Sequence, residues 1–297
     1  MSVPAAYLGI VLIWATTPLA IKWSAEEAGF LLGVTARMVI GYAVCLLFLW
    51  MLRIEFPWHR QARNAYLAAG LGLFGGLLSV YWGAQFIPSG LVSVLFGLSP
   101  IMIGLFATYW LGEQRFSTGK LFGIVLAIVG LAVIFMPAGS YSQIAPQGIV
   151  AVLVAVTVQA LSAVWVKRIG GELHPMSINS GALSIAVPLY LVVWLLFDGR
   201  LPEVMSERSL GAVVYLALFG TVLGFNLYFY VLKRVSATVL SLVTLITPVL
   251  ALLIGNGLNG ETITPRIWFG AGAILLGLVS FQWGGRVLRR LRMACVH

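Results

Sequence analysis

The sequence predicts an all-α integral membrane protein with ten transmembrane helices, arranged as two inverted five-helix repeats around a central cavity. Three observations lead to this fold: the composition, a series of long apolar runs, and a matched residue spacing in the two halves. Of the 297 residues, 61% are hydrophobic and only 9% are charged. Soluble domains carry about a quarter charged residues, and disordered chains need high charge with low hydrophobicity. The composition therefore excludes a soluble enzyme and a disordered chain.

The apolar runs have the length of membrane-spanning helices. A helix needs about 20 apolar residues to cross a bilayer, whereas a transmembrane strand has about 10 residues of alternating polarity. The connections are short, so no soluble domain is expected. The ten runs lie at residues 4–23, 30–52, 64–86, 88–111, 117–137, 147–168, 176–197, 209–232, 236–258 and 264–287.

The basic residues predict the orientation. The first run has neither a basic leader nor a small-residue cleavage site, so we expect it to be retained. With the N-terminus in the cytoplasm, 13 of the 18 Lys and Arg lie inside and 4 outside, with Arg37 within a span. Cytoplasmic loops carry this excess, so we expect a multi-pass protein of the bacterial inner membrane with both termini cytoplasmic. The net charge of +9 then indicates contact with anionic lipid, and no nucleic-acid partner.

An internal repeat divides the chain. A shift of 148 residues places Ser93 on Ser241, Pro100 on Pro248 and Glu113 on Glu261. Each half has five spans, an odd number, so the second half enters the membrane from the opposite side. We expect repeats at 1–143 and 144–297. Inverted repeats are typical of secondary transporters, whose substrate site lies near the midplane between the halves.

Several short motifs occur in a characteristic order along the whole chain. They are Trp14–Lys22 (WATTPLAIK), Arg37, Leu98–Pro100, Leu111–Glu113, the glycine-rich fifth span, Ile246–Pro248 and Asn259–Glu261. In these motifs the sequence resembles the drug/metabolite transporter superfamily, EamA type, and within it the YddG amino-acid exporters. The resemblance implies a ten-helix fold with a central cavity, and export of amino acids, aromatic ones included, or of related small metabolites.

Polar and aromatic residues within the spans are candidates for the cavity wall, because polar groups in hydrocarbon are costly and face a cavity or another helix. An uncharged lining suits a zwitterion with an apolar side chain. Two alternatives remain open: Ser and Thr bond to carbonyls of their own helix, and Trp and Tyr lie at the membrane interface. Ser79, Thr221 and Tyr228 are further polar residues of the same spans. The candidates are Trp14, Thr17, Tyr81, Trp82, Gln85, Ser93, Gln159, Ser162, Trp165, Asn226, Tyr230, Ser241 and Thr244.

Charged residues and prolines have two interpretations each. Arg37 could bind a substrate carboxylate, but its position favours a structural role, by pairing with helix carbonyls or by snorkelling; Lys22 is expected to snorkel. Glu113 and Glu261, at helix ends, are expected to cap helices or to pair at a gate. Proline kinks a helix and is interpreted either as a hinge for alternating access or as a fixed kink. The prolines concerned are Pro18, Pro100, Pro188 and Pro248.

The absent motifs limit the function further. There is no phosphate-binding loop, and the three histidines have no metal-ligand spacing, so neither a cofactor nor a metal is expected, nor an enzyme. No Asp or Glu lies mid-span, which favours gradient-driven or exchange transport over obligatory proton coupling. Cationic drugs or nucleotide sugars are the alternative substrates. Small residues four apart let helices approach closely, which favours packing within the chain; a monomer or a weak homodimer is expected.

Overall fold

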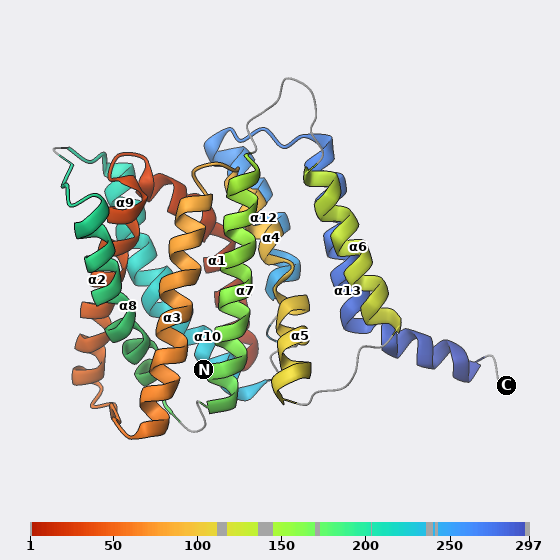
Figure 1. The fold of residues 1–297 in the computed structure, drawn as a ribbon, viewed down its shortest axis with the longest axis horizontal. Coiled ribbons are helices and arrows are strands. Elements are labelled where there is room, and N and C mark those ends of the chain that lie inside the picture. The colour runs from red at the N-terminus through yellow and green to blue at the C-terminus, as the bar shows by residue number, and fades with distance from the viewer. Residues whose placement is uncertain are drawn as a thin grey trace.

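The computed structural model describes residues 2–111, 118–135, 145–169, 173–202, 204–235, 240 and 243–294. Within these ranges every regular element is a helix. The helices, shown in Figure 1, are α1 (Val3–Ala25), α2 (Gly29–Met51), α3 (Arg60–Gly83), α4 (Ser89–Phe96), α5 (Ser99–Leu111), α6 (Thr118–Phe135), α7 (Pro146–Ile169), α8 (Pro175–Phe197), α9 (Glu207–Tyr215), η1 (Leu216–Gly224), α10 (Phe225–Arg234), α12 (Val243–Asn259) and α13 (Pro265–Ala294).

These helices confirm the predicted membrane fold. In the described part of the chain, seven helices are long and apolar enough to cross a bilayer, with α4–α5 and α9–η1–α10 each counted as one. Three shorter apolar helices lie at Leu121–Ile134, Ile246–Asn259 and Pro265–Phe281. A helix of 23 residues, such as α1, is about 35 Å long, which exceeds the hydrocarbon thickness of a bilayer.

Two spans are not simple α-helices. The fourth span is broken at Gly97–Leu98, between α4 and α5, and Pro100 is the second residue of α5. Pro100 therefore begins a helix, where its missing N–H costs nothing, and does not kink a helix interior. In the eighth span, Leu216–Gly224 forms a π-helix between α9 and α10. Such wide turns are frequent at functional sites.

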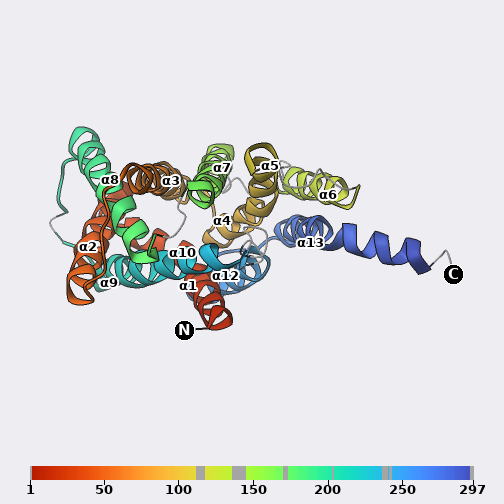
Figure 2. The ribbon, with the colours of Figure 1, turned by 90° about the horizontal axis from the view of Figure 1, so that it is seen from below.

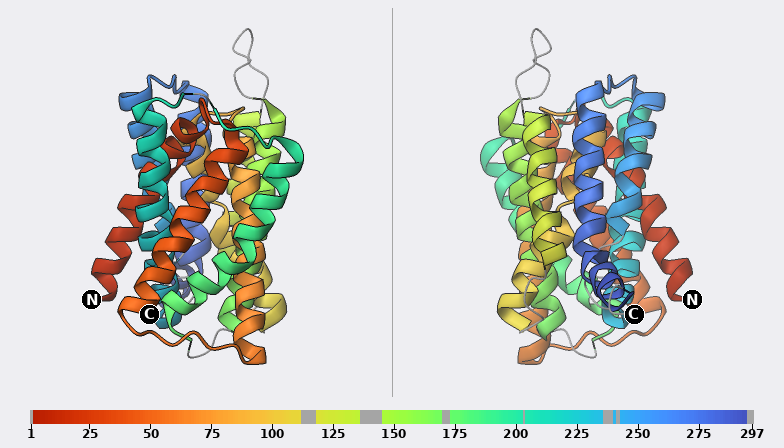
Figure 3. Two further views of the ribbon diagram at one scale, coloured as in Figure 1. Left: turned by 90° about the vertical axis from the view of Figure 1, so that its left-hand side faces the viewer. Right: turned by 90° about the vertical axis from the view of Figure 1, so that its right-hand side faces the viewer.

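The helix contacts have the symmetry of an inverted repeat. The span counterparts are α1 and α7, α2 and α8, α3 and α9–α10, α4–α5 and α12, and α6 and α13. The contact of α3 with α7 therefore has its equivalent in the contact of α10 with α1. In the same way, the contact of α5 with α7 is equivalent to that of α12 with α1. Helix α2 contacts its own counterpart, α8. The N-terminal end of α1 and the C-terminal end of α13 lie toward the same end of the bundle (Figure 3). The predicted repeat boundary at 143/144 lies outside the described residues.

Helices α6 and α13 form a pair at one side of the molecule (Figures 1 and 2). Their contact depends on glycine: a Cβ at Gly123 would lie 2.6 Å from the Phe281 backbone nitrogen, and one at Gly277 would lie 2.8 Å from the Ala127 nitrogen. The small residues of these two helices are thus used for packing within the chain, as predicted.

Two of the histidines cap helices. His59 accepts a hydrogen bond from the Ala62 N–H at the start of α3, and His174 accepts one from the Met176 N–H at the start of α8. In the described part of the chain, no group of His, Cys, Asp and Glu could hold a metal ion.

Candidate functional site

The two halves enclose a central cavity of about 150 Å³. Its wall is formed by α1, α2, α3, α4, α5 and by α7, α10 and α12, so both repeats contribute. Cavity waters need about 10–15 Å³ each, so the space corresponds to about ten water molecules and fits a small solute. The polar and aromatic residues of the wall are Trp14, Thr17, Arg37, Ser93, Phe96, Ser99, Gln159, Ser162, Phe225, Tyr228, Phe229, Thr244 and Thr247.

The structure brings eight of the candidate residues singled out from the sequence into this wall, together with Tyr228. Their side chains come from helices of both halves, although they are up to 230 residues apart in the sequence. Pro18 lies in the wall as well, inside α1. The eight are Trp14, Thr17, Pro18, Arg37, Ser93, Gln159, Ser162 and Thr244.

Six other candidates do not reach the cavity. Trp82 and Trp165 lie outside the cavity wall, with 40% and 47% of their surface exposed. Gln85 is exposed and donates to the Trp82 carbonyl. Tyr81 is fully buried in the core. These residues are polar or aromatic, as expected of a lining, but their positions on the helix turn them elsewhere.

The last two of the six lie on α10. Asn226 donates a hydrogen bond to the carbonyl of Val222, four residues earlier in the same span. Tyr230 holds the guanidinium of Arg234 over its ring, 3.5 Å from the ring centroid. Ser241 and Glu113 lie outside the described residues.

Aromatic rings form one side of the cavity. The rings of Trp14 and Tyr228 lie 5.4 Å apart, and Phe225 meets Trp14 at 6.3 Å with the rings edge to face. The sequence placed Tyr228 among the polar residues of its span but gave no sign of Phe225. A phenylalanine in an apolar run carries no signal that distinguishes a cavity wall from a lipid face.

The hydroxyl groups of the wall are partly satisfied within the protein. The Thr17 hydroxyl donates to the Ile13 carbonyl of its own helix at 2.7 Å, and the Ser162 hydroxyl donates to the Ala68 carbonyl of α3 at 2.9 Å. Their protons are thus engaged, which matches the self-bonding alternative for Thr17. Each oxygen keeps lone pairs that can accept from a solute.

Arg37 is the one cationic residue in the described part of the wall. Its side chain is 1% exposed, so it does not snorkel toward an interface. Nε donates to the Thr221 hydroxyl of η1 at 2.8 Å, while Nη1 is buried and has no hydrogen-bond partner. The described wall contains no Asp or Glu.

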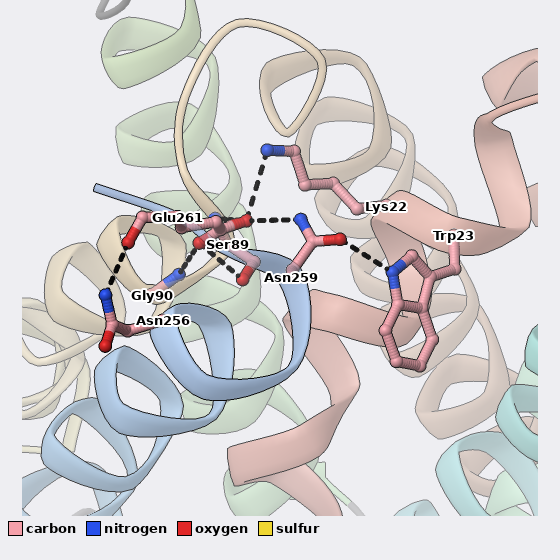
Figure 4. A network of polar contacts seen from close by, with 7 residues as sticks. All are labelled: Lys22, Trp23, Ser89, Gly90, Asn256, Asn259 and Glu261. Atoms are coloured by element: carbon pink, nitrogen blue, oxygen red, sulfur yellow. Dashed lines mark hydrogen bonds and ion pairs between the residues drawn. The ribbon is translucent and has the colours of Figure 1, made fainter. Parts of the chain in front are cut away.

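A network of polar contacts joins three helices at one end of the cavity (Figure 4). The Glu261 carboxylate, just after α12, accepts from Lys22 of α1 at 3.2 Å. It also accepts from the backbone N–H of Ser89 at 3.1 Å and from the Ser89 hydroxyl at 2.9 Å, at the start of α4. Asn259 donates to the same carboxylate and accepts from the Trp23 indole. We call these residues the end network: Lys22, Trp23, Ser89, Gly90, Asn259 and Glu261.

The contacts of the end network bear on the roles predicted from the sequence for Glu261 and Lys22. Glu261 caps α4 and also pairs with a lysine, so capping and pairing occur together. Lys22 does not snorkel but binds Glu261. Burial raises the pKa of Glu261, but the hydrogen bonds from Ser89 and the charge of Lys22 outweigh it and lower the pKa below its ordinary value of 4.5.

The counterpart of Lys22 lies at the opposite end of the bundle. Under a shift of 145 residues Lys22 falls on Lys167, which donates to the carbonyls of Leu232 and Val235 at 2.6 and 2.8 Å. Each lysine therefore joins helix ends, Lys22 at one end of the bundle and Lys167 at the other.

The four prolines differ in position. Pro18 faces the cavity within α1, and Pro248 is buried within α12. Pro188 is inside α8 but exposed, away from the cavity. Pro100 begins α5, so of the four only Pro18 and Pro248 lie inside helices that carry cavity residues.

Comparison with known proteins agrees with this architecture. A model of the EamA-like transporter family matches residues 3–136 and again 146–281. An uncharacterized transporter of Archaeoglobus fulgidus is 34% identical over 221 residues, or 70% of this chain and 74% of that protein. The uncharacterized inner membrane transporter YedA of Escherichia coli is 27% identical over 283 residues, 94% of this chain and 90% of YedA.

A solved crystal structure shares the fold. It superposes with a TM-score of 0.70 over 97% of this chain and 98% of that chain, at 19% sequence identity.

Proposed function

The chain belongs to the EamA-like transporter family, and we propose that it exports neutral amino acids, aromatic ones included, or related small metabolites by alternating access. In this proposal it lies in the bacterial inner membrane with both termini in the cytoplasm, and the end network faces the outside. The observation that carries the proposal is the cavity between the two halves, with its aromatic and uncharged polar wall.

The wall chemistry supports a zwitterion with an apolar side chain. The Trp14–Tyr228 pair offers ring faces for an apolar or aromatic side chain, and such faces also attract an ammonium group. Gln159, Ser93 and Thr244 add amide and hydroxyl groups.

The two alternative cargo classes have less support. A lipophilic cation would favour a carboxylate in the wall, and the described wall has none. A nucleotide sugar carries about two negative charges and would favour several cationic groups, whereas the described wall offers Arg37.

The end network supports alternating access. Its six residues connect the ends of α1, α4 and α12 on the outer side of the cavity. While these contacts persist, the three helix ends stay together and the route to the outside is closed. Opening requires the Glu261 contacts to break, and the bound solute then leaves.

Transport by purified protein in liposomes tests the proposal. Uptake of labelled tryptophan, methionine and threonine should exceed that of empty vesicles and should saturate. Imposing and then collapsing a pH gradient separates proton coupling from exchange or gradient-driven flux. Absence of flux for every amino acid would refute the substrate class.

A thermal-shift screen separates the cargo classes at low cost, because a ligand that binds only the folded state raises the melting temperature. We expect shifts with neutral amino acids. Shifts with lipophilic cations or nucleotide sugars alone would replace the proposed substrate with one of those classes.

A further inference from the structure

We propose that Arg37 binds the carboxylate of the transported solute, so that the protein selects amino acids and related carboxylic acids against the corresponding amides and amines. This inference rests on the proposed function and specifies its substrate class.

The first observation is an uncompensated buried charge. Arg37 is 1% exposed, and in the described part of the chain it has no ion-pair partner. One contact, from Nε to the Thr221 hydroxyl at 2.8 Å, is neutral. A buried guanidinium without an anion is strongly unfavourable. A carboxylate arriving in the cavity would supply the missing charge.

The second observation is the free donor. Nη1 is buried, lacks a hydrogen-bond partner, and belongs to a side chain of the cavity wall. An arginine used only for helix packing engages its donors with carbonyl groups, since an unpaired buried donor costs about 1–3 kcal/mol. Guanidinium groups bind carboxylates through two parallel hydrogen bonds, and the unpaired Nη1 leaves a donor for that purpose.

The third observation is that the guanidinium is fixed in place by η1. Thr221, which receives Nε, lies on the π-helix, and its own carbonyl accepts from the Asn179 side chain at 3.0 Å. A Cβ at Gly220 would lie 2.8 Å from Nη2 of Arg37. The arginine therefore rests against a glycine of η1, and a larger residue there would displace it.

The fourth observation is the position of the aromatic pair relative to Arg37. A Cβ at Gly224, four residues after Gly220 on the same π-helix, would lie 3.4 Å from Nε1 of Trp14. Arg37 and Trp14 thus both contact η1, at positions about one helical turn apart. An α-amino acid can place its carboxylate on Arg37 and its ammonium or side chain against the Trp14 and Tyr228 rings.

The test compares acids with their amides on the intact protein in detergent. Binding of tryptophan and tryptophanamide, and of methionine and methioninamide, is measured by thermal shift over a concentration series. We expect the wild type to bind each acid about 10- to 100-fold more tightly than its amide, the range of a charged hydrogen bond.

In the Arg37→Gln variant the affinity for the acid should fall by a similar factor, so that the ratio of acid affinity to amide affinity approaches one. Arg37→Lys keeps the charge without the paired donors and should give an intermediate ratio. Arg63→Gln, the same change at an exposed position of α3, is the matched control and should retain the wild-type ratio.

The possible outcomes separate the two proposals. If the wild type binds and transports acids but binds amides equally well, the role of Arg37 is refuted and the proposed function stands. If neither acids nor amides bind or are transported, the proposed function fails and the role of Arg37 fails with it. The wild-type comparison needs no variant, so the result does not depend on Arg37→Gln folding.

Discussion

Replacing Glu261 by glutamine should open the end of the cavity that the end network closes, which faces the outside in the proposed orientation. The carboxylate receives five contacts: Lys22, the Ser89 N–H and Asn259 on one oxygen, and the Ser89 hydroxyl and the Gly90 N–H on the other. Glutamine has nearly the same shape but no charge, and its NH₂ group is a donor. If this NH₂ group takes the position of the oxygen that Ser89 Oγ and Gly90 contact, it faces the Gly90 N–H, another donor, and that hydrogen bond is lost.

The magnitude follows from these contacts. Hydrogen bonds to charged groups contribute about 1.5–3 kcal/mol and neutral ones about 0.5–1.5 kcal/mol, so the three contacts on the retained oxygen each weaken and the Gly90 bond is lost. The Lys22 side chain is 28% exposed, so solvent screening reduces its share. We expect the closed state to lose about 2–4 kcal/mol, which is about a 30- to 700-fold rise in the open-to-closed ratio.

Thiol accessibility measures this ratio. In a background that lacks the two native cysteines, a single cysteine replaces Ser93, a buried residue of the cavity wall. A membrane-impermeant thiol reagent is added outside intact cells. The modification rate should rise in Glu261→Gln, up to the factor above, until the open state predominates.

Glu207→Gln is the matched control, because Glu207 is an exposed glutamate in the first turn of α9. It should leave the modification rate unchanged. Equal rates in the wild type and in Glu261→Gln would show that the end network does not close the cavity, and a rise in both variants would show a general charge effect.

Three further predictions concern pH, packing and the aromatic wall. Because the closed state lowers the pKa of Glu261 from 4.5, closure should be full above that value and weaken as the outside pH falls through it; a pH-independent modification rate would contradict this. Gly123→Ala should destabilise the protein by about 1–3 kcal/mol through crowding, whereas Gly272→Ala, whose Cβ would meet nothing within 4 Å, should be neutral or slightly stabilising in thermal unfolding. Trp14→Ala should raise the KM for tryptophan, whereas Trp50→Ala, at a position 78% exposed, should not; equal KM values in both variants would remove Trp14 from the site.

The sequence could predict the spans because a bilayer imposes a length on every crossing helix. It could also predict the end network in part, because Glu261 recurs at a fixed distance from Pro248 as Glu113 does from Pro100. The cavity was harder to predict. A membrane helix is apolar toward lipid and toward its neighbours alike, so amphipathicity does not reveal which face is inside. Trp82 and Trp14 have the same side chain, yet Trp14 lies in the cavity wall and Trp82 is exposed outside it.

Backbone irregularities were beyond the sequence for another reason. A proline in an apolar run predicts a kink, but whether it interrupts a helix or begins one depends on the preceding residues, and the break at Gly97–Leu98 has no periodic signal. The π-helix at Leu216–Gly224 depends on one extra residue per turn, which hydropathy does not detect. Thr221, which accepts the hydrogen bond from Arg37, lies within this π-helix.

The three helices that the end network joins also contribute to the cavity wall, and this arrangement links binding to opening. Helix α1 carries Trp14 in the wall and Lys22 in the network, and α4 begins at Ser89 and carries Ser93 one turn later. Glu261 directly follows α12, which lines the wall. Suppose that a solute binds these wall residues more tightly in the closed state than in the open state. By thermodynamic reciprocity, the solute then stabilises the end contacts by the same free energy with which the end contacts favour its binding. Because the helices are rigid over the one or two turns between wall and network, a shift at the solute reaches the ion pair without an intermediate element.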